Sequence, residues 1–211
     1  MQELEVIGER VRQWFEEKNK ARDRALRQCR TLVRHSSTAI RAVHRREWEQ
    51  AQQRLKEARD LVEGLRKDLQ PYPDLYRAGY AWDGRKEYAE ASITYALIHG
   101  DPLPEPEKLD IEYDAYMAGL GEAVGELRRQ TLDLLRRDKI EEAERLLTAM
   151  DEIYALLVTI DFPDAITGNL RRITDVARGV TERTRGDLTT TFQQHELRAA
   201  LRSLEEKLDG S

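Results

Sequence analysis

Two pairs of glutamates stand in helical stretches of the sequence that carry almost no other charge. Glu87 and Glu90 are followed by a run without a formal charge until Asp101, and Glu122 and Glu126 are the charged residues of 115–127. Residues three or four apart lie on one face of a helix, about one turn apart. Each pair can therefore point both carboxylates to one place, where they would repel one another unless they bind protons or cations.

A divalent cation is the simpler partner for four such carboxylates. Oxygen ligands suit Mg²⁺ or Mn²⁺, which keep several water ligands and bind phosphates readily. A site of this kind can activate a water molecule or hold a phosphodiester for cleavage. The alternative is that Arg or Lys side chains of other helices neutralise the four acids in structural ion pairs. The spacing alone leaves both interpretations open.

The second glutamate pair lies in a segment that is rich in glycine. Gly119, Gly121 and Gly125 stand close together in it, and each costs roughly 1 kcal/mol of helix propensity relative to alanine. A helix that contains three such glycines is expected to pack very closely against a neighbouring helix.

Basic residues gather in an earlier segment, although the chain is acidic overall. The net charge is −5, yet the stretch from Lys18 to Arg46 contains a single acid, Asp23. Most of its arginines recur at helical spacings along one stripe. One interpretation is a solvated helix face without a ligand. The other is that the stripe binds the phosphate backbone of a nucleic acid without reading its sequence. The residues predicted to do so are Arg24, Arg27, Arg34, Arg41 and Arg45.

Two other classes of helical metalloenzyme use acids in similar ways. Di-iron carboxylate bundles need Glu-x-x-His steps on two helices, and none of the four histidines follows an acid at that spacing. That class is excluded. All-α nucleotide pyrophosphohydrolases resemble this arrangement, because they pair a Glu-x-x-Glu helix with a later acidic helix around Mg²⁺. They are the alternative enzyme class.

The elements that must position these residues are expected to be helices in a single main domain. Of the 211 residues, 36% are charged with both signs nearly balanced, which suits long amphipathic helices. No apolar stretch approaches the roughly 20 residues that cross a bilayer, and the residues after Met1 do not resemble a secretion signal. The single cysteine, Cys29, excludes an intramolecular disulfide. We therefore expect a cytoplasmic protein without a membrane partner.

Proline and glycine punctuation divides the chain into about seven expected helices. Residues 2–69 predict a hairpin of two helices with a break near 45–48. The later helices are expected over 75–100, with an interruption near 83–84, and over 111–136, 139–159, 163–185 and 192–208. We assign 1–188 to one helical domain and 189–211 to a C-terminal helical extension.

Several stretches of the sequence resemble the translin superfamily, and within it the catalytic branch of translin-associated factor X. The most specific is Lys-Glu-Tyr-Ala-Glu-Ala, which contains the first glutamate pair, and the next is the acidic helix with its Gly-Glu-Leu step. The flanking helices are similar more weakly, and the resemblance extends over about 20–188. The matching stretches are 86–91, 113–119 with 122–129, 170–181 and 30–44.

The resemblance implies an all-α subunit that assembles into a hollow octamer and holds RNA, or single-stranded DNA, inside. It also implies metal-dependent endoribonuclease activity with Mg²⁺ or Mn²⁺ as the cofactor. By position, the catalytic and metal-binding acids would be Glu87, Glu90, Glu122 and Glu126. The family often has Asp at the position of Glu122, so the longer side chain would shift the metal by the length of a methylene group. Translin itself lacks this set of acids, so their presence favours the enzymatic branch.

Overall fold

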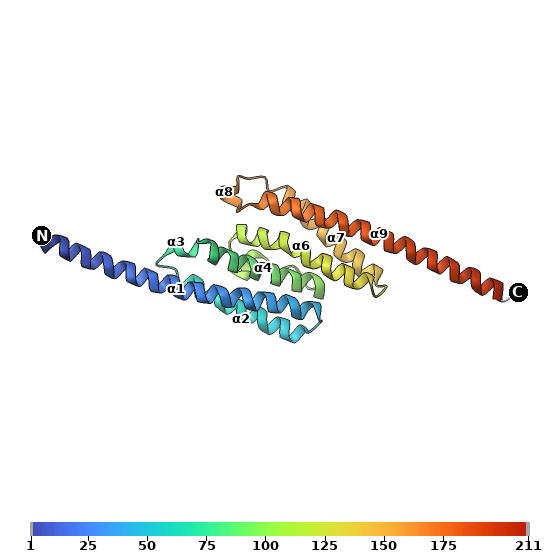
Figure 1. Cartoon of the computed structure of the whole chain (residues 1–211), viewed down its shortest axis with the longest axis horizontal. Coiled ribbons are helices and arrows are strands. Elements are labelled where there is room, and N and C mark those ends of the chain that lie inside the picture. Colours follow the sequence, from blue (N-terminus) through green and yellow to red (C-terminus); the bar gives the residue numbers. More distant parts are fainter. Residues whose placement is uncertain (1, 210–211) are drawn as a thin grey trace.

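The computed structural model describes residues 2–209, and nearly all of them are helical (Figure 1). Within this range the chain forms six long helices and three helices of four residues, which confirms the all-α prediction. The long helices are α1 (Gln2–His44), α2 (Trp48–Asp68), α4 (Gly79–His99), α6 (Tyr113–Leu135), α7 (Ile140–Val158) and α9 (Leu170–Asp209). The short ones are α3 (Pro73–Tyr76), α5 (Pro106–Leu109) and α8 (Asp164–Thr167).

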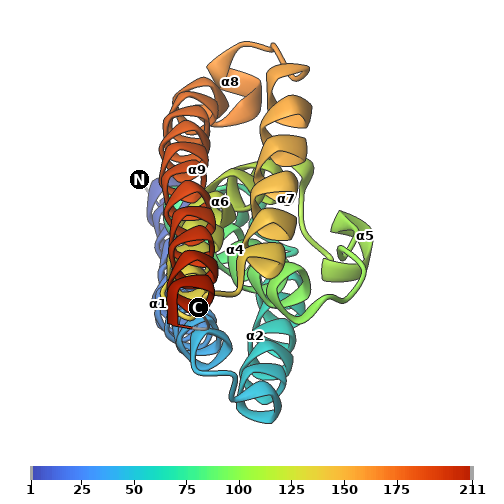
Figure 2. The same ribbon diagram turned by 90° about the vertical axis from the view of Figure 1, so that its right-hand side faces the viewer.

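The long helices pack in three pairs, which are α1 with α2, α4 with α6, and α7 with α9 (Figures 1 and 2). The pair of α4 and α6 is central, because α1 packs on α4 from one side and α7 and α9 pack on α6 from the other. Residues 91–96 of α4 are all buried, so this part of the charge-free run after Glu90 faces protein on every side. Burial on all sides explains why this stretch has no charged face.

The first and the last long helices are far longer than the helices on which they pack. α1 has 43 residues and α9 has 40, and their free ends project from the bundle in opposite directions (Figure 1). The expected break near 45–48 is confirmed, because α1 ends at His44 and α2 begins at Trp48.

The expectation of about seven helices was wrong, for two reasons. The first is that the predicted break between the last two helices is absent. The segments 163–185 and 192–208 are largely joined in α9, which continues through Gly186 and the threonine run after it. The hydroxyls of Thr189, Thr190 and Thr191 donate to the carbonyl oxygens four residues earlier, so their polar groups are satisfied within the helix, although such bonds do not themselves favour it. Leu188 is buried in the core, and this tertiary contact offsets the low helix propensity of the glycine.

Short helices at the proline-rich connections are the second reason for the difference in number. α3 and α5 begin at Pro73 and Pro106, where the missing N–H costs nothing because the first turn has no partner for it. The interruption expected at 83–84 is also absent. Gly84 is buried against α1, where an added Cβ would lie 3.1 Å from Cδ2 of Leu32, so the glycine there serves close packing.

The proposed division of the chain at residue 188 stays a prediction, and α9 crosses that position as one helix. Residues 1, 210 and 211, at the ends of the two predicted segments, lie outside the described residues. Between residues 2 and 209, none of the helices combines the length and the apolar character that crossing a membrane requires.

Candidate metal centre and cleft

The helices α4 and α6 approach each other most closely beside the predicted acids, and Gly119 makes this possible. A Cβ on Gly119 would lie 2.6 Å from Cβ of Ala89, 2.7 Å from the carbonyl oxygen of Lys86 and 2.8 Å from the amide nitrogen of Glu90. Any larger residue would push the two backbones apart. The close packing expected from the glycine-rich segment is therefore present at Gly119, where it brings the two acidic helices together, whereas a Cβ on Gly125 would meet nothing within 4 Å.

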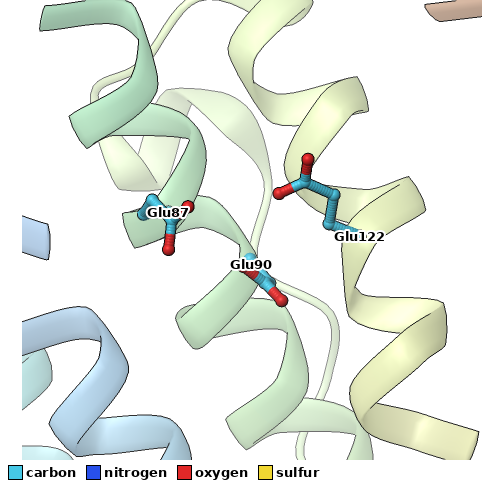
Figure 3. Close-up of side chains that lie close together, drawn as sticks. All are labelled: Glu87, Glu90 and Glu122. Carbon is cyan, nitrogen blue, oxygen red and sulfur yellow. The ribbon is translucent and has the colours of Figure 1, made fainter. Parts of the chain in front are cut away.

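Glu87 and Glu90 of α4 and Glu122 of α6 direct their carboxylates to one place between the helices (Figure 3). One ligand oxygen of each residue lies within 4.8 Å of those of the other two. Oxygens bound to the same Mg²⁺, at about 2.1 Å each, lie up to roughly 4.2 Å apart. A small adjustment of the side chains would thus close the group, here called the acidic triad, around one ion.

Lys86 is the cation of this group. Its Nζ lies 2.7 Å from Oε2 of Glu122 and 3.6 Å from Oε1 of Glu87, while its side chain is 13% exposed. Glu90 has no ion-pair partner among the described residues. Three ionised carboxylates and one ammonium leave two negative charges, which a single divalent cation balances.

Glu90 is the member of the triad for which ionisation is least favourable. Burial, reinforced by the charges of Glu87, Glu122 and Glu126, raises the pKa of Glu90 to about 8. Burial also raises the pKa of Glu87. Glu90 therefore keeps a proton at neutral pH unless a cation lies beside it.

Glu126, the fourth predicted acid, is held by another helix. Its Oε2 lies 2.5 Å from Nε2 of His44, at the end of α1, and Nδ1 of that ring lies 3.4 Å from Oε1 of Gln130. The hydrogen bond with His44 lowers the pKa of Glu126. Of the four acids, three converge and the fourth stands beside them, close enough to affect Glu90 but tied to α1.

A cleft opens from the triad toward α9. It has a volume of about 290 Å³, and its acidic end is formed by Glu90 and Glu122. The opposite wall consists of apolar residues and one arginine of α9, namely Arg172, Ile173, Val176, Ala177 and Val180. Gly121, Val124 and Gly125 of α6 also border the cleft.

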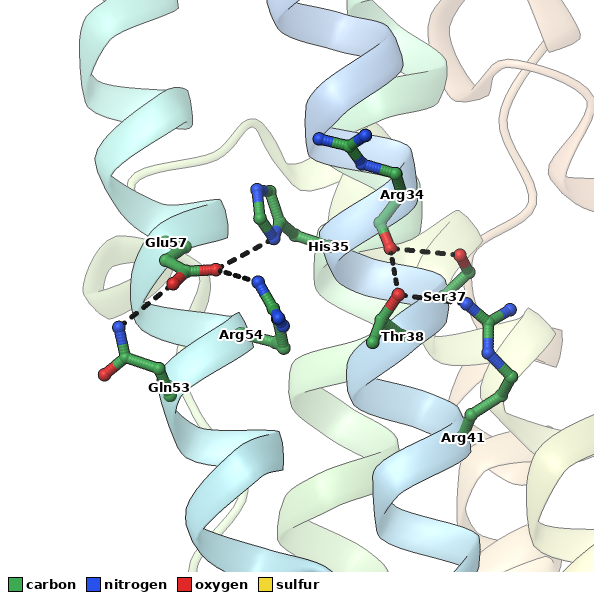
Figure 4. Close-up of polar contacts among 8 residues, drawn as sticks. All are labelled: Arg34, His35, Ser37, Thr38, Arg41, Gln53, Arg54 and Glu57. Carbon is green, nitrogen blue, oxygen red and sulfur yellow. Dashed lines mark hydrogen bonds and ion pairs between the residues drawn. The ribbon is translucent and has the colours of Figure 1, made fainter.

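All five arginines predicted to bind phosphates are exposed, four of them on α1 and Arg45 directly after it. Arg41 donates to Oγ1 of Thr38 at 2.9 Å (Figure 4), and none of the five forms an ion pair within residues 2–209. Polar side chains that face α2 behave differently, because Nδ1 of His35 of α1 lies 2.9 Å from Oε2 of Glu57 of α2 (Figure 4). The arginines of the stripe thus stay available for an external anion.

Sequence reasoning missed three side chains of the site. Lys86 directly precedes Glu87, and this adjacency was the one signal that it belongs there. His44 and Arg172 lie far from the acids in sequence. The packing of α1 brings His44 to Glu126, and the packing of α9 brings Arg172 to the cleft that Glu90 and Glu122 line. No periodicity within a single helix identifies such residues.

The triad fits a divalent cation by the chemistry of its donors. The oxygens of Glu87, Glu90 and Glu122 are the ligand type that Mg²⁺ and Mn²⁺ prefer. The raised pKa of Glu90 shows that the protein alone does not stabilise all three as carboxylates. A cation would remove this penalty.

The chain folds as a three-layered helical bundle with a carboxylate-lined cleft, and solved structures share the fold. AfC3PO, in a structure described as a complex with duplex RNA, superposes with a TM-score of 0.83 at 34% identity, over 88% of this chain and 96% of that one. A crystal structure of AfC3PO gives 0.82 at 34% identity, over 88% and 97% of the two chains. The chain belongs to the C3PO/translin family.

Two further similarities are more distant or less informative. An uncharacterized protein of Methanocaldococcus jannaschii is 30% identical over 190 residues, which are 89% of this chain and 84% of that protein. Apo-NeC3PO has a TM-score of 0.74 at 23% identity, over 89% and 96% of the chains, and this similarity shows the fold alone. No protein-family model matches the chain.

Proposed function

We propose that this protein is a metal-dependent endoribonuclease related to the translin-associated factor X branch of its family. The observation that carries the proposal is the acidic triad, in which Glu87, Glu90 and Glu122 converge at the end of a cleft. The similarity to AfC3PO, which was solved with duplex RNA, supports RNA as the substrate class.

In this proposal Glu87, Glu90 and Glu122 hold Mg²⁺ or Mn²⁺. The ion, when bound, supplies Lewis-acid chemistry by polarising a phosphodiester and lowering the pKa of a water ligand. Glu126 stays ionised because of its hydrogen bond with His44, and its other oxygen, Oε1, would accept a proton from an attacking water. Lys86 orients Glu122 and Glu87 through the two ion pairs.

The arginine stripe of α1 is proposed to bind the phosphates of RNA or of single-stranded DNA. All five side chains are exposed and free of acidic partners in the described chain, so no internal ion pair has to break on binding. Contacts of this kind give affinity without sequence readout and weaken steeply as salt is added.

Self-association is proposed as well, with a homo-octamer as the expected assembly. The projecting end of α1 exposes a stripe of apolar residues at heptad spacing, and their exposed fractions are 71% for Leu4, 48% for Ile7, 46% for Val11 and 47% for Trp14. Buried residues of the same helix, such as Ala25 and Leu32, continue this stripe into the core. An apolar face of this length in water favours a protein partner.

In the rival interpretation the acids only form structural ion pairs. The contacts of Lys86 are the one observation that favours it. Its ammonium does neutralise part of the charge of Glu122 and Glu87. Glu90 nevertheless lies beside them without a cationic partner of its own in residues 2–209, and the shortfall of positive charge favours a metal site.

The proposal is tested with labelled single-stranded RNA, duplex RNA and free nucleoside triphosphates, each incubated with Mg²⁺, Mn²⁺ or EDTA. We expect RNA cleavage that needs the metal, that EDTA stops and that Glu90→Ala abolishes. Hydrolysis of nucleoside triphosphates instead of RNA would identify a nucleotide pyrophosphohydrolase. Metal-independent binding of RNA without cleavage would identify a non-catalytic nucleic-acid-binding assembly.

A further inference from the structure

Arg172 is the one cationic side chain in the described lining of the cleft beside the acidic triad. It belongs to the first turn of α9, whereas the acids belong to α4 and α6. The cleft is thus closed by a third helix, and that helix brings a positive charge to a wall that is otherwise apolar.

The adjacent arginine, Arg171, forms an ion pair within the protein. Its Nη2 donates to Oδ1 of Asp161 at 2.8 Å, and both side chains are well exposed. Arg172 makes no hydrogen bond or ion pair with its side chain within residues 2–209, although Glu90 and Glu122 line the same cleft. No nitrogen of Arg172 comes within 4.0 Å of a carboxylate oxygen in that range.

A cation and carboxylates that share a cleft without pairing leave room for a ligand group between them. The group must be anionic on the side of Arg172. A divalent cation on the acidic side would attract the same anion, so the two positive centres would face one ligand from opposite walls. A phosphate fits both, because a guanidinium binds two of its oxygens through a planar fork of N–H donors.

We propose that Arg172 binds a phosphate of the RNA backbone inside the cleft and so holds that phosphodiester at the acidic triad. The inference rests on the proposed function, and it adds a phosphate-binding residue from α9 to a site otherwise built by α4 and α6. The apolar residues Val176 and Val180 on the same wall would lie against the sugar. The arginine stripe of α1 binds the strand outside the cleft, whereas Arg172 acts within it.

The experiment compares Arg172→Ala and Arg172→Lys with Arg171→Ala, a variant of the adjacent arginine outside the cleft. Three quantities are measured for each folded variant: the affinity for Mn²⁺ without RNA, the affinity for a short RNA with and without Mn²⁺, and kcat/KM for RNA cleavage. Thermal unfolding confirms that the variants are folded.

We expect Arg172→Ala to lower kcat/KM on the order of 10²-fold and to weaken RNA binding in Mn²⁺, with an unchanged affinity for Mn²⁺ itself. Arg172→Lys should recover part of the loss because it keeps the charge but not the fork, and Arg171→Ala should behave like the wild type. Equal RNA affinity of the two alanine variants would overturn the inference, as would a loss of Mn²⁺ binding in Arg172→Ala. Wild-type protein that binds Mn²⁺ and RNA without cleaving would defeat the proposed nuclease activity, yet the difference in RNA affinity would still decide the role of Arg172.

Discussion

Glu90 is the residue whose protonation most affects the metal-free protein. Its pKa is about 8 in the fold, against an ordinary value of 4.5. The folded protein therefore holds a proton that the unfolded chain releases as the pH rises from 4.5 to 8, and over this window the free energy of unfolding falls.

Replacement of Glu90 by Gln should raise the melting temperature of the metal-free protein at pH 8 and leave it nearly unchanged at pH 4. Each 1 kcal/mol regained corresponds to roughly 2–4 °C for a chain of this size. Calorimetry in EDTA measures the effect, and Glu141→Gln, at an exposed position of α7, is the control. A variant less stable than the wild type at pH 8 would contradict the burial of charge at Glu90.

His44 and Glu126 form a half-buried pair that links α1 to the site. His44→Ala should lower the free energy of unfolding by about 1–3 kcal/mol, because the acid and Gln130 lose a buried partner. The depressed pKa of Glu126 contributes stability above its ordinary value of 4.5 that is lost on acidification, so the difference between variant and wild type should shrink toward pH 3.

A double-mutant cycle with Glu126→Gln measures this pair directly in urea unfolding. The two substitutions together should cost clearly less than the sum of their separate effects. Additive effects would mean that the two side chains act independently.

The sequence predicted the two helices of the site and the faces on which the acids lie, because spacing within one helix determines both. It did not predict that Glu126 would stand apart from the other three. That outcome depends on His44, which lies 82 positions away in sequence and reaches Glu126 only when α1 packs on the central pair. The spacing of residues along one helix does not reveal which residues of another helix they contact.

At the scale of elements, the contact of α4 with α6 sets the distance between the acids. Gly119→Ala should destabilise the protein by about 1–3 kcal/mol, because the new methyl overlaps the backbone of α4 at Lys86 and Glu90. The affinity for Mn²⁺ should fall with it. Calorimetric titration and thermal unfolding measure the two effects.

Gly125→Ala is the matched control for that substitution in the same helix. Its Cβ would meet nothing within 4 Å, so the gain in helix propensity, roughly 1 kcal/mol, should appear as added stability. Equal effects of the two alanines would show that close packing at Gly119 is not what positions the acids.

The stripe of α1 makes a prediction about salt dependence. Arg27→Gln with Arg34→Gln should weaken RNA binding for all sequences alike and lower the slope of log affinity against log salt by roughly 0.7–0.9 for each phosphate that is no longer neutralised. Fluorescence anisotropy over a series of salt concentrations measures it. The control is Arg59→Gln on α2, an exposed arginine paired with Glu63, which should leave the slope unchanged. An unchanged slope in the double variant would mean that the stripe is only a solvated helix face and does not bind RNA.

Helix boundaries were predictable where proline or an abrupt change of apolar face marks them, as between α1 and α2. The continuity of α9 was not, since the local propensity of Gly186 and the three threonines is overruled by the burial of Leu188 and by the ion pair of Asp187 with Arg128 at 2.8 Å. The sequence shows that Gly186 lowers the helix propensity, but it does not show the contacts of Leu188 and Asp187 that offset this cost.

At the scale of the whole molecule, the projecting end of α1 predicts association. Ile7→Glu with Val11→Glu places charges in the exposed apolar stripe and should reduce the molar mass in solution, as measured by size-exclusion chromatography with light scattering. Glu5→Gln, at another exposed position of this segment, is the control. A wild-type protein that is monomeric at micromolar concentration would contradict the proposed assembly.

The rate of RNA cleavage as a function of Mn²⁺ concentration tests most directly whether the acidic triad forms a catalytic metal site. The wild type should be inactive in EDTA and gain activity to a plateau as Mn²⁺ is added, while Glu90→Gln, prepared in the same way and shown to be folded, should be slower by on the order of 10²-fold or more at every concentration. Cleavage by Glu90→Gln at the wild-type rate, or wild-type cleavage that persists in EDTA, would contradict a catalytic metal site at the acidic triad.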